Sequence, residues 1–192
     1  GVYSDLSLFT CRETFGQGLT ELFNILTGYT RPQRFPHLIL APVGLREHFV
    51  NSIRREADHA QAGQPARIIA KINSLVDPAV IDELYRASQA GVEIDLIVRG
   101  MCSLRPAVPG ISERIRVISI IDRYLEHARI FYFQNNGKPE YLLASADWMQ
   151  RNFDRRVEIA FPVVDEQHQA MLKKILEIQL GDHVDGWRIE PD

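Results

Sequence analysis

Residues 66–99 read ARIIAKINSLVDPAVIDELYRASQAGVEIDLIVR, and this stretch decides the fold class. The apolar runs 66–73 and 92–99 each predict a strand. Between them, residues 78–90 carry apolar side chains at helical spacing and stop at Gly91, a residue type that commonly ends helices. Two strands joined through a helix form a βαβ unit, which predicts a parallel strand pair covered by a helix.

The alternation of strands and helices continues on both sides of this unit. Upstream, we expect a strand over residues 3–10, a helix over 13–26, a linker over 29–36, a strand over 38–41 and a helix over 44–62. Downstream, we expect a loop over 101–110, strands over 115–121, 128–133, 140–144 and 155–164, a helix over 165–180 capped by Asp165, and a short strand near Trp187. Asn135-Asn136-Gly137 predicts a hairpin turn. The sequence therefore predicts an α/β fold with a mixed, largely parallel sheet flanked by helices.

Length and composition agree with one globular domain. The 192 residues suit an α/β domain with or without a short leader, and 45% hydrophobic and 24% charged residues are ordinary values. No apolar run approaches the ~20 residues of a membrane-spanning helix, and no signal peptide is recognisable. The net charge of −3 argues against a broad nucleic-acid-binding face, so a bound polyanion would have to meet a local basic cluster. Cys11 and Cys102 lack metal-ligand spacing, which indicates free thiols in a reducing compartment.

The most informative polar residues are His127 and Arg129. Residues two apart in a strand point to the same face, so the two side chains should project side by side. An imidazole can exchange a proton near neutral pH, and a guanidinium can bind phosphate oxygens bidentately. Ser145 and Asp147 have the same spacing at the end of another expected strand. The alternative interpretation is an ordinary strand histidine beside structural polar residues.

A second polar group lies at the expected carboxyl ends of the βαβ strands, where open α/β sheets bind ligands. Arg99 ends one strand, and Gly100 after it would let the backbone approach a ligand closely. Lys71 and Asn73 end the other strand on one face. The alternative is that these charges are solvated or paired with surface carboxylates.

Longer sequence words resemble a known family. Residues 73–77 (NSLVD), 99–104 (RGMCSL), 123–127 (RYLEH) and 145–149 (SADWM) resemble, in the same order, the C-terminal catalytic domain of the long, four-domain polyphosphate kinases. Tyr3-Ser4-Asp5 resembles the Tyr-Thr-Asp that closes the preceding domain of that family. The His-x-Arg and Ser-x-Asp pairs resemble the His-x-Lys and Ser-x-Asn patterns of the phospholipase D superfamily. The resemblance implies a phospholipase D-like domain over residues 31–192, with the end of the preceding domain, as a leader strand and helix, over residues 1–30.

The resemblance also implies an activity, the reversible transfer of the ATP γ-phosphate to the end of inorganic polyphosphate. His127 matches the family's second histidine and would act as a general acid or stabilise the leaving phosphate. Arg99 matches a nucleotide-contacting arginine, and Tyr3 matches an adenine-stacking tyrosine. Arg129 would bind phosphate, where the wider superfamily has lysine. Lys71, Asn73, Ser145 and Asp147 are expected to support the site. The family's phosphorylated histidine belongs to the preceding half, so the isolated chain is expected to be inactive.

The implied ligands are ATP or ADP and inorganic polyphosphate, and the full enzyme is expected to use Mg²⁺ through ligands outside this chain. The implied partners are the N-terminal and first catalytic domains of the same polypeptide and further copies in a homo-oligomer, with no nucleic acid. We expect a cytoplasmic location, with membrane association as an alternative.

Two other functions stay open. A phospholipase D-like hydrolase half could complete its site by homodimerisation, although Arg129 in place of lysine counts against it. A non-catalytic module could bind polyphosphate or nucleotide without turnover.

Overall fold

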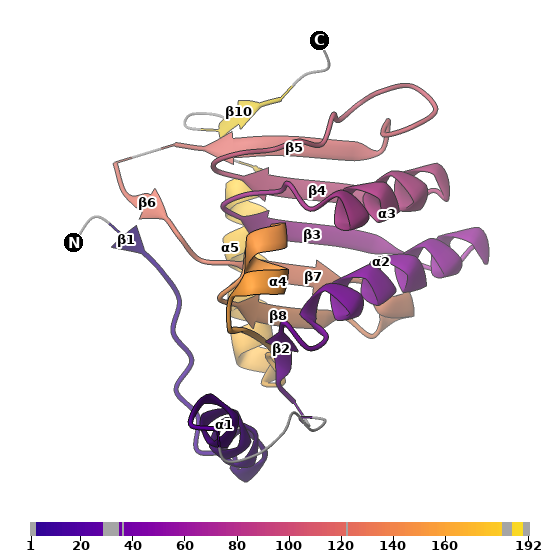
Figure 1. The fold of residues 1–192 in the computed structure, drawn as a ribbon. Helices are drawn as coiled ribbons and strands as arrows, with labels where there is room; N and C mark the ends of the chain where they lie inside the picture. The colour runs from indigo at the N-terminus through magenta and orange to yellow at the C-terminus, as the bar shows by residue number, and fades with distance from the viewer. Residues whose placement is uncertain (1–2, 29–34, 36, 122, 182–185, 190–192) are drawn as a thin grey trace.

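The computed structural model describes residues 3–28, 35, 37–121, 123–181 and 186–189 (Figure 1). Among these residues, eight strands form one sheet. In order across the sheet they are β10 (Gly186–Arg188), β5 (Ile115–Ile120), β4 (Glu93–Val98), β3 (Arg67–Ile72), β7 (Ile130–Phe133), β8 (Glu140–Ala144), β9 (Glu158–Pro162) and β2 (Ile39–Ala41). A separate parallel pair joins β1 (Tyr3–Ser4) to β6 (Leu125–Glu126).

The sheet is mixed, as predicted, but its parallel part is small. Within the eight-stranded sheet of described residues, only β3, β4 and β5 run parallel to one another. The pairings β3–β7, β7–β8, β8–β9, β9–β2 and β5–β10 are antiparallel. The expectation of a largely parallel sheet is therefore wrong, because β7 joins β3 antiparallel and the hairpin then extends the sheet with further antiparallel pairs. The predicted turn closes that hairpin as η1 (Asn135–Gly137), a short 3₁₀ helix with positive φ at all three residues.

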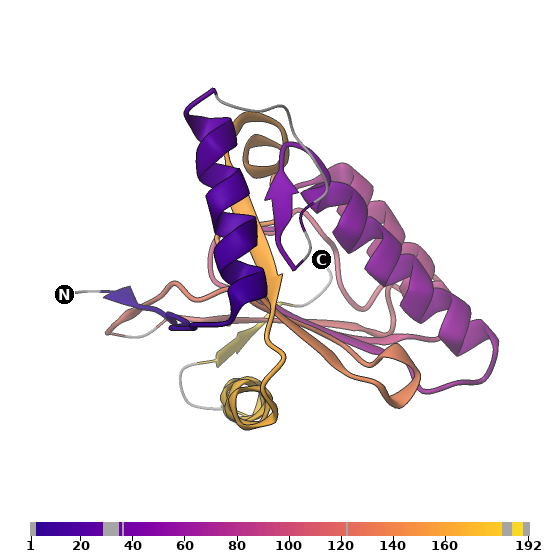
Figure 2. The same ribbon diagram turned by 90° about the horizontal axis from the view of Figure 1, so that it is seen from below.

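Helices cover both faces of the sheet (Figure 2). One face carries α2 (Leu45–Gln61), α3 (Pro78–Gln89) and the short α4 (Gln150–Arg155), and the other carries α5 (Glu166–Leu180). Asp77 caps α3 by accepting from Val80 N at 3.2 Å, and Asp165 caps α5 as predicted, accepting from the amides of Gln167 and His168. Gly91 follows α3 with φ 104°, the conformation that favours glycine after a helix.

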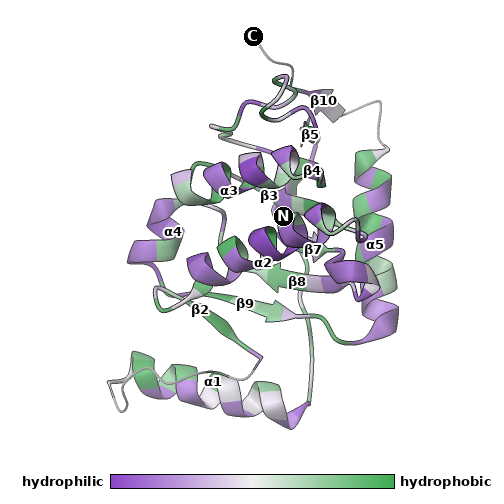
Figure 3. Ribbon diagram, turned by 90° about the vertical axis from the view of Figure 1, so that its right-hand side faces the viewer, coloured by the Kyte–Doolittle hydropathy of each residue, from purple (hydrophilic) through white to green (hydrophobic). Residues whose placement is uncertain are grey.

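The leader helix α1 (Glu13–Leu26) lies along the β2–β9 edge (Figures 1 and 2). Its buried Phe15 and Leu22 pack against Leu38 and Leu40. Figure 3 shows hydrophobic colouring along β2, β8 and β9, the strands nearest this helix. The leader is thus packed onto the same body as the rest of the described chain.

Alternation along β3 decides which side chains meet which layer. Ile68, Ala70 and Ile72 join the core beneath α2 and α3, whereas Ile69 joins the cluster beneath α5. Lys71 is two residues beyond Ile69 and therefore points to the α5 face, where it is 3% exposed. A lysine consequently lies in an otherwise apolar layer.

Two expected strands are shorter in the structure, and one expected linker falls mostly outside the described residues. The strand expected over residues 3–10 is limited to Tyr3–Ser4. The strand expected over 155–164 is shorter, Glu158–Pro162, because residues 150–155 form α4, which buries Phe153 against Phe49 at a ring distance of 6.3 Å. The linker expected over 29–36 falls mostly outside the described residues.

Both cysteines are free thiols, as predicted. In the part of the chain that the structure describes, no helix has the length and apolar character needed to cross a membrane.

Candidate functional site

Five polar residues lie where strands of the main sheet, or of the β1–β6 pair, end or begin. Asn73 follows β3, Arg99 follows β4, His127 follows β6, Arg129 directly precedes β7, and Asp147 lies just after β8. The β1–β6 pair lies beyond the carboxyl ends of β4 and β5 (Figure 1). The site therefore occupies the sheet edge where open α/β folds present ligands.

His127 is held by the leader segment. Its Nδ1 lies 2.7 Å from Oδ2 of Asp5, and its backbone N donates to Ser4 O at 2.8 Å. The ring of Tyr3 meets the imidazole edge-on, with centroids 5.5 Å apart. An ionised carboxylate only accepts hydrogen bonds, so Nδ1 is the donor and Nε2 carries the lone pair of the neutral ring. The imidazole keeps access to solvent, since 34% of its surface is exposed.

The charge on Asp5 is stabilised by this arrangement. Partial burial acts to raise the pKa of Asp5, but the hydrogen bond from His127, the Leu6 amide and the charges of His127 and Arg129 outweigh it, and the net pKa is lowered. Asp5 was missing from the predicted site residues. Its only sequence signal was its place in the word Tyr3-Ser4-Asp5.

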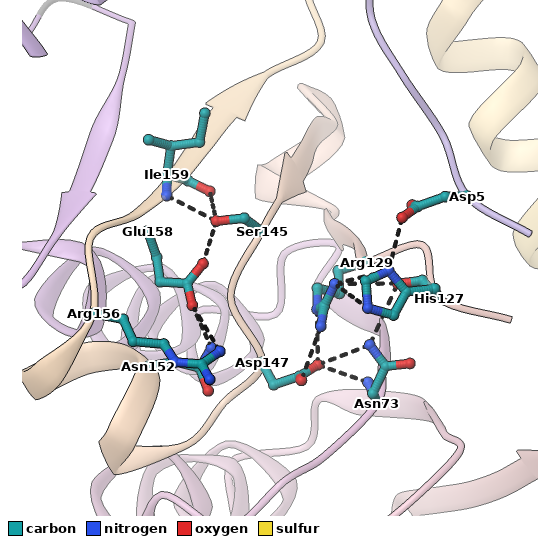
Figure 4. A network of polar contacts seen from close by, with 10 residues as sticks. All are labelled: Asp5, Asn73, His127, Arg129, Ser145, Asp147, Asn152, Arg156, Glu158 and Ile159. Carbon is teal, nitrogen blue, oxygen red and sulfur yellow. Dashed lines mark hydrogen bonds and ion pairs between the residues drawn. The ribbon is translucent and has the colours of Figure 1, made fainter. Parts of the chain in front are cut away.

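Arg129 is bound bidentately by Asp147 (Figure 4). Nε lies 2.9 Å from Oδ1 and Nη2 lies 3.1 Å from Oδ2, and both side chains are nearly buried. Nη1 of Arg129 lies 3.4 Å and 3.5 Å from the two ring nitrogens of His127 and donates to His127 O at 3.3 Å. The side-by-side placement of His127 and Arg129 is confirmed, but each nitrogen of the guanidinium already has a protein contact. This geometry suits an orienting role better than direct phosphate binding.

Asn73 extends the same network. Its backbone N donates to Asp147 Oδ1 at 2.8 Å, and its side-chain Nδ2 donates to Asp147 Oδ1 at 3.2 Å and to His127 O at 3.3 Å. Asn73 thus links the end of β3 to both the carboxylate and the histidine backbone.

Arg99 brings an unsatisfied donor to this edge. Within the described part of the chain, Nη1 of Arg99 and Oδ1 of Asn73 are buried and have no hydrogen-bond partner. Lys71 Nζ lies 3.3 Å from Glu126 Oε2. Burial lowers the pKa of Lys71, Glu126 works in the opposite direction, and the charge of Arg99 lowers it further. A buried guanidinium nitrogen without an acceptor is a candidate binding point for an anionic oxygen.

Ser145 does not join Asp147, contrary to the prediction that they share a face. Its Oγ makes a short hydrogen bond to the Glu158 carboxylate and accepts from Ile159 N at 3.1 Å. Asn152 Nδ2 donates to Glu158 Oε1 at 2.6 Å, so Ser145 belongs to a separate group in Figure 4. The reason is that β8 ends at Ala144, before Ser145, and strand alternation no longer applies.

Gly100 also differs from its expected role. Its N donates to Asn73 O at 2.7 Å, and a Cβ at this position would lie 2.8 Å from that same oxygen. The close backbone approach predicted for a ligand is therefore an approach to Asn73, which joins the ends of β3 and β4.

Among the described residues, no three His, Cys, Asp or Glu side chains gather in a way that could hold a metal ion.

Sequence comparisons give one consistent result. The family model described as "Polyphosphate kinase C-terminal domain 2" matches residues 38–192. The polyphosphate kinases of Thermosynechococcus vestitus and Synechocystis sp. are 59% and 54% identical to this chain over 191 residues. Those alignments cover 100% of this chain and 26% of each relative, so the chain spans about a quarter of their length.

Structural comparisons agree. The crystal structure of polyphosphate kinase from Porphyromonas gingivalis is similar to 95% of this chain with a TM-score of 0.92 and 44% identity, and the match covers 28% of that chain. Nuc, a phospholipase D family member from Salmonella typhimurium, matches 80% of this chain and 97% of its own with a TM-score of 0.57. At 12% identity, the second match shows the phospholipase D-like fold alone.

Proposed function

Because this chain belongs to the polyphosphate kinase family, we propose that it supplies one half of a site for reversible transfer of the ATP γ-phosphate to inorganic polyphosphate. One observation carries the proposal. Asp5 holds His127 at Nδ1, Asn73 links the His127 backbone to the end of β3, and the neighbouring strand end carries Arg99, whose Nη1 is buried without a partner among the described residues. A proton carrier and a free cationic donor are what phosphoryl transfer requires of a protein surface.

His127 is the proposed general acid. When the bond between the γ-phosphorus and the bridging oxygen breaks, Nε2 of the imidazolium delivers its proton to the departing ADP oxygen, and the reverse reaction returns it. Asp5 supports this step, because a carboxylate at Nδ1 stabilises the imidazolium and fixes the ring orientation. The acceptor of the phosphoryl group belongs to the part of the polypeptide that precedes this chain.

Arg99 is the proposed phosphate ligand. A phosphate oxygen that binds here gives the buried Nη1 a hydrogen-bond acceptor. Phosphate binding thus satisfies this donor and at the same time neutralises the charge of the phosphate oxygen. Arg129 acts through His127, since Asp147 and the histidine already occupy its donors. Asn73 also holds His127, because its Nδ2 donates to the backbone oxygen of His127.

Tyr3 is the proposed nucleotide platform. Its ring is 69% exposed and lies edge-on to His127. An exposed aromatic face beside a phosphate site can stack on an adenine ring. ATP, ADP and polyphosphate are therefore the proposed ligands.

The larger assembly is also part of the proposal. We assign residues 1–30 to the end of the preceding domain and residues 31–192 to the phospholipase D-like domain. The remaining domains of the polypeptide, Mg²⁺ bound outside this chain, a homo-oligomer and a cytoplasmic location stay predictions.

The test measures ligand binding by the 192-residue chain and turnover by the full-length protein that contains it. We expect the chain to bind ATP and tripolyphosphate without turnover. His127→Ala and Arg99→Ala should weaken binding, and both should lower kcat of the full-length protein. Arg114→Ala is the matched control, because Arg114 pairs with Glu93 at the opposite end of the sheet.

Three outcomes would contradict the proposal. Binding unaffected by either substitution would remove these residues from the site. Turnover by this chain alone would contradict the half-site. Hydrolysis of a simple phosphodiester would favour the phospholipase D-like alternative completed by homodimerisation.

A further inference from the structure

The segment that carries His127 has little backbone support. It follows β6, which is two residues long and pairs with β1 and with no strand of the main sheet among the described residues. The pairing with β1 also comes from a two-residue strand. Something other than sheet pairing must therefore hold this segment at a constant distance from the main body.

The side chain of Glu126, the residue before His127, supplies that connection. Its Oε2 lies 3.3 Å from Lys71 Nζ and accepts from Gln179 Nε2 at 3.0 Å. Lys71 lies in β3, whose neighbours on both sides pair with it at this residue: Ile97 in β4 and Ile130 in β7. Gln179 lies in the last turn of α5. Glu126 thus joins the loose segment to the centre of the sheet and to the helix covering it.

This connection is costly for stability. Lys71 is 3% exposed in a layer shared with Ile69, Leu172 and Leu176. Removing an ammonium from water in such a layer is unfavourable, and well-packed apolar side chains often stabilise a fold more than a buried ion pair does. The Lys71–Glu126 pair beside the candidate site is therefore explained better by the position that it gives to β6 than by the stability that it contributes.

We propose that Glu126 is a positioning residue for His127, with Lys71 and Gln179 as its anchors on the sheet and on α5. The ion pair fixes the distance between β6 and the main sheet, and thereby holds the imidazole of His127 beside Asp5 and Arg129. This inference rests on the proposed function only in assigning His127 a role in the reaction.

The experiment uses the full-length protein that carries these residues and three variants: Glu126→Leu, Lys71→Met and the double variant. Three quantities are measured: kcat with KM for ATP, the midpoint of urea unfolding, and the rate at which diethylpyrocarbonate modifies His127. Peptide mass spectrometry follows that modification, with His168 as the internal reference. The matched control is Lys173→Met with Glu177→Leu, an exposed ion pair on α5.

Glu126→Leu leaves the buried Lys71 ammonium without its partner, and Lys71→Met leaves the partly exposed Glu126 carboxylate without its own, so both should lower the unfolding midpoint. The double variant removes both charges, so its midpoint should recover. Its kcat should nevertheless stay lower by about 10- to 100-fold with KM little changed, because small misplacements of a catalytic group have effects of that size. Modification of His127 should be faster than in the wild type, and the control pair should change none of these quantities.

Recovery of kcat together with the midpoint would overturn the inference, because it would show a purely structural pair. An unchanged rate of His127 modification in all variants would also overturn it. A failure of the proposed function can be told apart from a failure of this inference. If His127 has no role in the reaction, His127→Ala leaves turnover intact, whereas faster modification of His127 in the double variant would still show that Glu126 positions it.

Discussion

Oδ2 of Asp5 lies 2.7 Å from Nδ1 of His127, although 122 positions separate the two residues in the sequence. The family model matches residues 38–192, so the carboxylate that orients the histidine comes from outside the matched range. The parallel pairing of β1 with β6 brings it there. A phospholipase D-like domain that began at residue 38 would keep His127 and lose the carboxylate at its Nδ1.

Asp5→Asn should lower kcat of the full-length protein with little effect on folding. The amide keeps the size of the side chain but loses the charge that stabilises the imidazolium. General acid–base catalysis contributes about 10²–10⁴-fold, so we expect a loss of at least about tenfold. Asp165→Asn is the control, because Asp165 also faces a histidine, His168, at 3.6 Å but lies in the α5 cap. Equal kcat values for Asp5→Asn and the wild type would contradict the assigned role.

Asp147→Ala should destabilise the fold strongly. It leaves Arg129, nearly buried, without a counter-charge and removes the acceptor for Asn73 N. Breaking a buried ion pair from one side costs about 3–5 kcal/mol in the free energy of unfolding. Asp154→Ala breaks a bidentate pair with Arg46 on the surface and should cost much less, because exposed ion pairs contribute little to stability. Urea unfolding measures both, and similar costs would show that the Asp147 pair is not effectively buried.

Gly100→Ala should also destabilise the chain, through a backbone clash. The new Cβ would lie 2.8 Å from Asn73 O, and neither strand end can move away without breaking the Gly100 N–Asn73 O hydrogen bond. Crowding of this kind costs about 1–3 kcal/mol. Gly16→Ala is the opposite case, because Gly16 lies in α1 with open space at its Cβ position. That substitution should stabilise by about 0.5–1 kcal/mol, and thermal unfolding of the two variants should shift in opposite directions.

The buried Lys71 predicts an unusual pH dependence. Burial lowers its pKa below the ordinary 10.5, so just below pH 10.5 the unfolded chain binds this proton more than the native chain does. Stability from this residue must then rise with pH over that window and level off above it. The free energy of unfolding of the wild type minus that of Lys71→Met should therefore increase between neutral pH and 10.5. A flat difference would show that Lys71 titrates normally.

Local features of the fold were predictable because they depend on neighbours in the sequence. The βαβ unit of residues 66–99 forms as expected, with two apolar strands and a helix that stops before Gly91. The β7–β8 hairpin also follows from its own turn residues. By contrast, α4 was not predicted, because a helix of six mostly polar residues is too short to show a helical repeat of apolar side chains. It forms because Phe153 and Asn152 are buried against the rest of the domain.

The candidate site was also predictable only in part. The pairing of His127 with Arg129 followed from their spacing, and the residue types of Arg99, Lys71 and Asp147 were visible at the expected strand ends. What these side chains contact was not visible. Ser145 turns to Glu158, Arg129 is held by Asp147, and Lys71 is paired with Glu126.

By itself, the sequence determined the α/β class, most element positions and the residues able to carry phosphate chemistry, because periodicity and residue type act over a few positions. Tertiary structure alone decided that Asp5 meets His127, that the sheet turns antiparallel after β3, and that a lysine is buried behind the site. Hydrogen bonds and ion pairs form over about 3 Å in space whatever the separation along the chain. Their partners are therefore set by how the elements pack, which spacing in the sequence does not encode.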